Sequence, residues 1–140
     1  MRNMQKRYVY EGKNFDSKPE LAYYIWLKDH NADFAYQPDV SYEYEHNGVI
    51  HIYEPDFIVE GQAVEIKGDH FFKEDGTMQN PFDHSQDALY EAKHQCMLLN
   101  EVKIMKSDEY EFYVAYVEQK YGKDYLKSFK NSDKMACHAA

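Results

Sequence analysis

Apolar side chains recur with a helical period in several parts of the chain. Over residues 17–30 they follow the 3.6-residue repeat, and Ser17 with Glu20 forms a capping-box pattern at the start. Further helices are predicted over about 85–100, from Ser107 to Gly122, and over about 123–130. In the helix at 85–100, the apolar side would consist of Ala88, Leu89, Ala92, Cys96 and Leu99.

The segments between these helices have the patterns of strands and turns. Strands are predicted over residues 39–46, 49–53, 56–59 and 63–67, with a short further strand at 102–105. Asn47-Gly48 and Glu60-Gly61 are turn signals that would join neighbouring strands, and we expect the strand at 49–53 to continue past Pro55. Residues 68–84 are expected to form a long loop. The predicted order is α-β-β-β-α-β-α.

Length and composition favour one globular domain over residues 1–140. Hydrophobic residues make up 44% of the chain and charged residues 29%, which is typical of a folded domain. No apolar run approaches the roughly 20 residues of a membrane-spanning helix, and the first twelve residues lack the apolar stretch of a secretory signal. Cys96 and Cys137 form no CxxC pair, which disfavours a cysteine zinc site. We therefore expect a cytoplasmic protein without a membrane partner.

The charge is distributed unevenly along the chain. A net charge of −9 disfavours a protein that coats DNA nonspecifically. Residues 1–18 and 120–134 nevertheless each carry five basic and two acidic side chains, whereas acidic residues dominate the centre. This pattern fits a metal site flanked by phosphate contacts. The alternative is a solvated acidic surface with two basic tails.

The most informative residues are Asp56, Glu65 and Lys67. Glu65 and Lys67 lie two apart on one predicted strand, so their side chains point to the same face. Pairing through the Glu60-Gly61 turn would bring Asp56 near both. Adjacent carboxylates are hard to keep ionised without a cation, and Mg²⁺ takes oxygen ligands, usually one or two carboxylates with waters. The alternative is a polar face of a half-exposed strand beside a bulge at Asp56.

This pattern resembles the PD-(D/E)XK nuclease superfamily. Pro55-Asp56 matches its PD, and Glu65-Ile66-Lys67 matches its ExK. The resemblance implies an α/β fold with a restriction-endonuclease-like α-β-β-β-α-β core at about residues 15–106, in which helices flank a mixed central sheet. A helical extension would follow at about 107–134. The resemblance also implies that Asp56, Glu65 and the Ile66 carbonyl bind Mg²⁺ or Mn²⁺, and that Lys67 acts on the attacking water.

Two further segments are candidates under the same resemblance. Many family members supply another metal-site carboxylate from the first helix, which Glu20 matches, although a capping-box glutamate would instead bind the Ser17 N–H. Gln86 and Tyr90 resemble a motif of the RecB-like branch that is thought to contact DNA or support the site. Lys93 lies on the same helical stripe and could touch a phosphate. The alternative for this stripe is a solvated helix face.

The resemblance predicts a Mg-dependent endonuclease that hydrolyses DNA and is directed by a DNA structure or end, or by a recruiting protein. TnsA-like, RecB-like and resolvase-like nucleases share such a compact core. A second copy of the chain is another candidate partner, and a bacterial or phage origin is expected. Two alternatives stay open: a catalytically idle nucleic-acid-binding module of the same fold, and an acidic mimic of DNA. Acids that converge with Lys67 would favour the nuclease, and acids spread over a face would favour the mimic.

Overall fold

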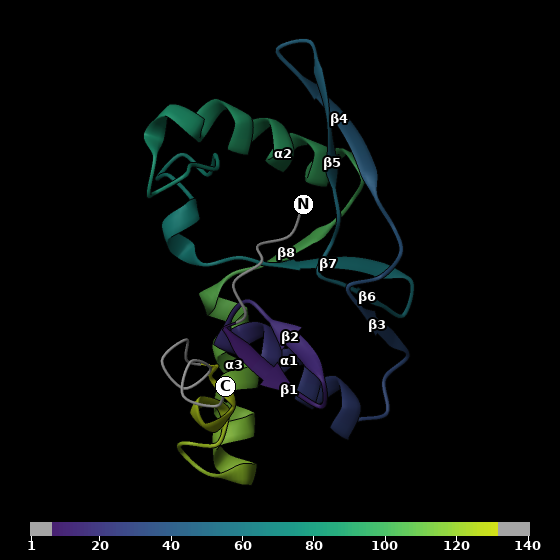
Figure 1. Ribbon diagram of the computed structural model, residues 1–140, viewed down its shortest axis with the longest axis vertical. Coiled ribbons are helices and arrows are strands. Elements are labelled where there is room, and N and C mark those ends of the chain that lie inside the picture. Colours follow the sequence, from purple (N-terminus) through teal and green to yellow (C-terminus); the bar gives the residue numbers. More distant parts are fainter. Residues whose placement is uncertain (1–6, 132–140) are drawn as a thin grey trace, which may run out of the picture. The chain divides into compact units, whose positions relative to one another are not determined.

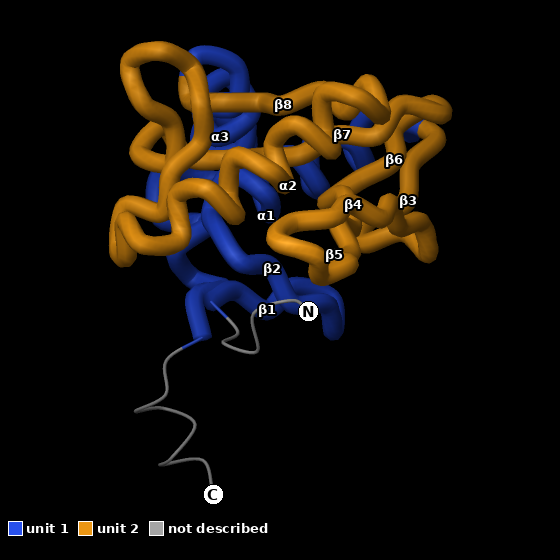
Figure 2. The backbone as a smooth tube through the Cα atoms, turned by 90° about the horizontal axis from the view of Figure 1, so that it is seen from above, with its two compact units in different colours: residues 1–32, 108–140 blue, residues 33–107 orange. Residues whose placement is uncertain are grey.

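The computed structural model describes residues 7–131 (Figure 1). Residues 1–6 and 132–140, which include Cys137 and part of both basic ends, lie outside the described residues. The chain divides into two compact units (Figure 2). Unit 1 combines residues 1–32 with 108–140, and unit 2 comprises residues 33–107. No helix within residues 7–131 is long and apolar enough to cross a membrane. The expectation of a single nuclease domain stays a prediction.

Unit 1 is built around two helices and a short hairpin. Its elements are β1 (Tyr8–Tyr10), β2 (Lys13–Phe15), α1 (Lys18–Asp29), α3 (Ser107–Tyr121) and the 3₁₀ helix η3 (Leu126–Phe129). Helix α1 begins where the capping pattern predicts, because the Ser17 side chain accepts a hydrogen bond from the Glu20 N–H at 3.3 Å. Of the final predicted helical piece, the structure has only the short 3₁₀ segment, which follows an interruption at Gly122 with φ of +121°.

The carboxylate of Asp29, at the end of α1, joins this helix to α3. It accepts hydrogen bonds from the Tyr116 hydroxyl at 2.9 Å and the Tyr121 hydroxyl at 2.8 Å, and it forms an ion pair with Lys120 at 3.2 Å. Burial alone would raise the pKa of Asp29, but these three donors lower it overall. Lys120, at the start of the basic segment 120–134, therefore has an acidic partner within its own unit.

Unit 2 contains a mixed four-stranded sheet and a separate hairpin. Its strands are β3 (Phe34–Tyr36), β4 (Tyr42–His46), β5 (Val49–Tyr53), β6 (Phe57–Val59), β7 (Gln62–Ile66) and β8 (Lys103–Met105). The sheet has the order β3-β6-β7-β8, in which only β7 and β8 pair in parallel. Strands β4 and β5 form the hairpin. The prediction of a mixed α/β fold is confirmed.

Two tight turns set the register of the strands in unit 2. Asn47 and Gly48 both have positive φ, at 53° and 76°, and so do Glu60 and Gly61, at 49° and 82°. Paired positive φ angles match the right-handed twist of the strands that they join. Both predicted turns are therefore confirmed. The predicted continuation of β5 past Pro55 is wrong, because β5 pairs with β4 whereas β6 pairs with β3 and β7.

Helix α2 (Asp87–Leu99) packs against the hairpin and one face of the sheet. The buried cluster beneath it consists of Tyr53, Ala63, Met78, Cys96, Met97 and Val102. The predicted apolar side of this helix is partly wrong, since Leu99 is 82% exposed whereas His94 is buried. His94 can be buried because its imidazole hydrogen-bonds the Glu91 carboxylate at 2.9 Å, which satisfies a ring nitrogen.

Candidate metal centre

Asp56 lies directly before β6 and is held from two sides. Its backbone carbonyl accepts a hydrogen bond from the Gln37 N–H at 2.8 Å, and its Oδ2 accepts one from the Ile66 N–H at 2.8 Å. The residue is only 7% exposed. The strand interruption at Pro55 thus turns the Asp56 side chain toward β7 instead of leaving it in solvent.

Glu65 lies on β7 opposite Asp56. The register pairs Phe57 with Val64, and one further step along both antiparallel strands sets Asp56 against Glu65. Glu65 is 5% exposed, and its Oε1 accepts a hydrogen bond from the Tyr53 hydroxyl at 2.7 Å. The structure therefore brings the two predicted carboxylates together in a buried setting, as the turn between their strands led us to expect.

Tyr53 is a site residue that the sequence pattern did not reveal. It ends β5, which belongs to the separate hairpin, and its ring is 1% exposed. Burial raises the pKa of its phenol strongly, and the charge of Glu65, the hydrogen bond to Glu65 and the charge of Asp56 raise it further. The Tyr53 hydroxyl therefore stays protonated at neutral pH and remains a hydrogen-bond donor to Glu65.

The Ile66 backbone offers a third oxygen at this place. Within a strand, the N–H and C=O of one residue leave the backbone on the same side. Because the Ile66 N–H points to the Asp56 carboxylate, the Ile66 carbonyl faces the same side of β7. This placement agrees with the ligand role that the family resemblance implies for Ile66.

Lys67 directly follows β7 and is partly buried. Its N–H donates to the Met105 carbonyl at 3.0 Å, which extends the pairing of β7 with β8 by one residue. Its Nζ lies 4.3 Å from the centroid of the Phe71 ring. An aromatic face attracts a cation that lies over it and so restricts the position of that cation. The ammonium is thus held over Phe71, and it belongs to the residue that directly follows the strand carrying Glu65.

The predicted stripe on α2 is only partly realised. Tyr90 stacks on Phe71, with centroids 6.2 Å apart and ring planes 3° apart, and the Nζ of Lys93 lies 5.6 Å from the centroid of Tyr53. The Phe71 ring therefore lies between Tyr90 and Lys67, and the Tyr53 ring lies between Lys93 and Glu65. Gln86 is exposed and ends the 3₁₀ helix η2 (His84–Gln86), so it precedes α2 instead of continuing the stripe.

Glu20 lies in unit 1, on the first turn of α1, and is 6% exposed. Its N–H donates to the Ser17 hydroxyl, which is one half of the capping box. The expectation that its carboxylate joins the metal site stays a prediction.

The donors that converge in unit 2 fit a hard divalent cation. Two carboxylates and one carbonyl supply only oxygen, the ligand atom that Mg²⁺ prefers, and Mg²⁺ commonly keeps waters in its other positions. Within residues 7–131, no group of three or more His, Cys, Asp and Glu side chains is placed to hold a metal ion. The centre would therefore depend on Asp56, Glu65 and the Ile66 carbonyl.

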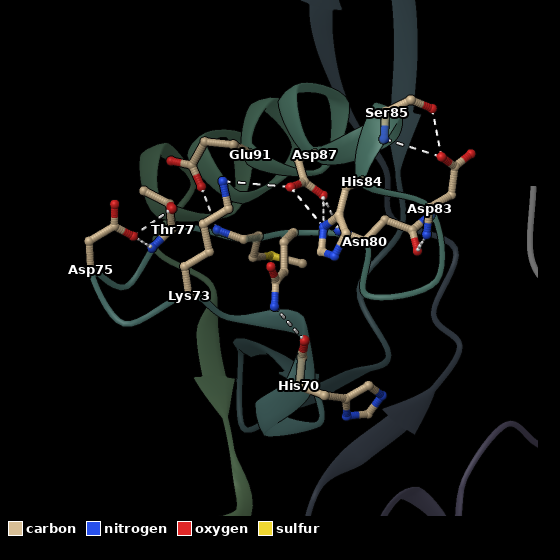
Figure 3. Close-up of polar contacts among 12 residues, drawn as sticks. His70, Lys73, Asp75, Thr77, Asn80, Asp83, His84, Ser85, Asp87 and Glu91 are labelled. Atoms are coloured by element: carbon tan, nitrogen blue, oxygen red, sulfur yellow. Dashed lines mark hydrogen bonds and ion pairs between the residues drawn. The ribbon is translucent and has the colours of Figure 1, made fainter.

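The predicted loop at 68–84 is ordered by polar contacts that join it to α2 (Figure 3). Lys73 pairs with Asp87 at 3.6 Å, and the His84 ring lies 3.2 Å from the same carboxylate. The N–H of Met78 donates to Glu91 at 2.8 Å, and Met78 itself is buried in the core. The loop is thus anchored to α2, and one of its residues, Phe71, contacts the Lys67 ammonium.

Comparisons of this chain with models of protein families, with curated proteins and with solved structures find no match. The case for a function therefore depends on the geometry around Asp56 and Glu65 and on the motif that these residues form.

Proposed function

We propose that this protein is a metal-dependent nuclease that hydrolyses DNA phosphodiester bonds with Mg²⁺ or Mn²⁺. The observation that carries the proposal is that Asp56, directly before β6, lies opposite Glu65 on the antiparallel neighbour β7, and that both residues are almost fully buried. Burying two carboxylates together is costly unless a cation compensates them. Lys67 follows at the end of the same strand, which completes the PD and ExK pattern in space.

Each residue has a role that follows from its place. Asp56, Glu65 and the Ile66 carbonyl, which all belong to unit 2, would hold the cation. A bound divalent cation would lower the pKa of a water and stabilise charge on the scissile phosphate. Lys67 is the group that would orient the attacking water or stabilise charge that develops on the phosphate.

The surrounding residues support these roles. Tyr53 fixes one oxygen of Glu65 through its hydroxyl. Phe71 restricts the Lys67 ammonium, and Tyr90 restricts Phe71 by stacking. Hydrogen bonds and packing around metal-binding groups orient those groups and tune their affinity. We propose that Tyr90 and Lys93 serve the site in this way or contact DNA, and that Gln86 contacts DNA from its exposed position.

The arrangement favours the nuclease over the two alternatives. An acidic mimic of DNA would display its carboxylates, whereas Asp56 and Glu65 are turned inward and bonded to Ile66 and Tyr53. A catalytically idle module would not need Lys67 beside two buried acids. We propose a restriction-endonuclease-like topology, with cleavage directed by a DNA structure or end or by a recruiting protein, and with a dimer as a candidate assembly.

Cleavage assays on linear, nicked and branched DNA test this function. Asp56→Asn and Glu65→Gln should abolish Mg²⁺-dependent cleavage, because each removes an anionic ligand at nearly constant volume. Each new side chain keeps an oxygen that can accept the bond from Ile66 or Tyr53, so melting temperatures should stay the same or rise as repulsion is relieved. Glu43→Gln, at an exposed position on β4, is the matched control and should cleave normally. Full activity in both site variants would refute the assignment.

A further inference from the structure

An exposed aromatic ring lies near the candidate metal centre. The Phe82 side chain is 81% exposed. It meets His70 and Phe71 at angles of 71° and 77°, with ring centroids 5.9 and 6.2 Å away. Contacts at such angles, together with the high exposure, leave a ring face of Phe82 in water. Phe71 is the ring that holds the Lys67 ammonium, so a single ring separates Phe82 from the proposed catalytic lysine.

Hydrogen bonds fix the turn that contains Phe82, and Figure 3 shows two residues of this turn, Asn80 and Asp83. The side-chain oxygen of Asn80 accepts bonds from the N–H groups of Phe82 at 2.9 Å and Asp83 at 3.2 Å. The Asn80 N–H in turn donates to Asp87 at 2.8 Å, which ties the turn to the start of α2. A contact surface that is already ordered loses little conformational freedom on binding. The backbone that carries Phe82 is therefore ordered before any ligand arrives.

One of the carboxylates around this turn has a cationic partner, because Lys73 forms an ion pair with Asp87 at 3.6 Å. A second lysine lies at the same end of the sheet. Lys106 directly follows β8, and its Nζ lies 4.6 Å from the centroid of Phe72. Lys67 and Lys106 together give this edge two cations that are held over aromatic rings.

We propose that Phe82 stacks on an unpaired nucleobase, so that the substrate of this site is single-stranded or splayed nucleic acid instead of intact duplex. The inference depends on the proposed nuclease function and specifies its substrate class. In a duplex each base is paired and stacked on its neighbours, whereas an unpaired base offers its face to an aromatic side chain. Every base has such a face, so the preference is for strand structure and not for sequence.

Fluorescence anisotropy with labelled oligonucleotides tests this inference in the Glu65→Gln background, where cleavage does not interfere. The probes are a single strand, a blunt duplex of the same sequence and a fork with unpaired tails. Phe82→Ala should weaken binding of the single strand and the fork by roughly 5- to 150-fold, the range expected for one lost base stack. Binding of the blunt duplex should not change. Phe82→Trp keeps an aromatic ring and should bind as the parent background does. Phe112→Ala, which removes a 61% exposed ring from α3, should have no effect.

Several results would overturn the inference. One is that Phe82→Ala binds the single strand as tightly as the Glu65→Gln background does. Another is that Phe82→Ala weakens binding of the blunt duplex by the same factor. The third is that the Glu65→Gln background binds no oligonucleotide. The dependence of affinity on salt should stay the same in Phe82→Ala, because a stack involves no phosphate. If the unsubstituted chain cleaves forks and Phe82→Ala cleaves them equally well, the inference fails while the nuclease function stands. If Phe82→Ala weakens binding of the single strand but the unsubstituted chain does not cleave, the nuclease function fails while the stacking role of Phe82 stands.

Discussion

Replacing Tyr53 with phenylalanine removes one hydroxyl and keeps a buried ring in place. That hydroxyl donates to Glu65 Oε1 at 2.7 Å, and both residues are at least 95% buried. A hydrogen bond to a charged group contributes about 1.5–3 kcal/mol, and a buried acceptor that loses its donor pays its full desolvation penalty. The unfolding free energy of the metal-free protein should therefore fall by about 1.5–3 kcal/mol.

Thermal and urea unfolding measure this loss. For a chain of this size, the expected change is a decrease in Tm of roughly 5 to 12 °C. Tyr42→Phe is the matched control, because Tyr42 packs on the same cluster and stacks on Tyr53 at 6.1 Å, whereas the hydroxyl that bonds Glu65 is that of Tyr53. It should alter the unfolding free energy by less than about 0.5 kcal/mol.

The same substitution should weaken metal binding, because Glu65 would lose the group that fixes one of its oxygens. Loss of such a supporting hydrogen bond typically lowers metal affinity by about 10- to 100-fold. A double-mutant cycle with Glu65→Gln isolates the contribution of the pair. Equal stability of Tyr53→Phe and Tyr42→Phe, with no coupling to Glu65, would refute the reasoning.

Three further predictions concern other groups. Lys67→Ala should reduce cleavage far more than Mn²⁺ affinity in calorimetry, because an ammonium is not a ligand; equal losses would make Lys67 structural. Asp29→Asn should destabilise the protein by about 1–3 kcal/mol at neutral pH. Because the pKa of Asp29 is lowered in the folded state, its contribution to the unfolding free energy is complete above about pH 4 and is lost as the pH falls further. The unfolding free energies of variant and parent in urea should therefore converge in acid. A difference in unfolding free energy that does not change with pH would contradict this. Because the pKa of Tyr53 is raised in the folded state, its contribution to the unfolding free energy is complete below about pH 10 and is lost as the pH rises above that value. In an absorbance titration its phenol should ionise only when the protein unfolds. Ionisation in the folded state would contradict the buried hydrogen bond to Glu65.

The parts of the fold that the sequence predicts are those with local causes. The start of α1 follows from Ser17 and Glu20, and the turn at Asn47-Gly48 follows from residues that accept positive φ. The short strand β3 has no such signal, since three residues show no clear alternation and its pairing partner β6 lies more than twenty residues away. Strand β5 could not be separated from β6 by pattern, because which partner each strand pairs with is decided by the whole sheet.

In the candidate site too, the residues that could be predicted are those whose positions have local causes. Asp56 and Glu65 could be paired from sequence, because one tight turn fixes their register. Tyr53 could not be assigned to Glu65, because it comes from a strand outside the sheet. The position of Phe82 could not be predicted from sequence either, since it depends on hydrogen bonds to the Asn80 and Asp87 side chains in and beside a long loop.

Calorimetric titration of Mn²⁺ into the full chain tests the central claim most directly, because it measures the metal centre without requiring the right DNA substrate. The account predicts Mn²⁺ binding by the parent protein, by Lys67→Ala and by the control Glu43→Gln, and loss of that binding in Asp56→Asn and Glu65→Gln. Absence of binding in the parent protein, or unchanged binding in both site variants, would contradict the account.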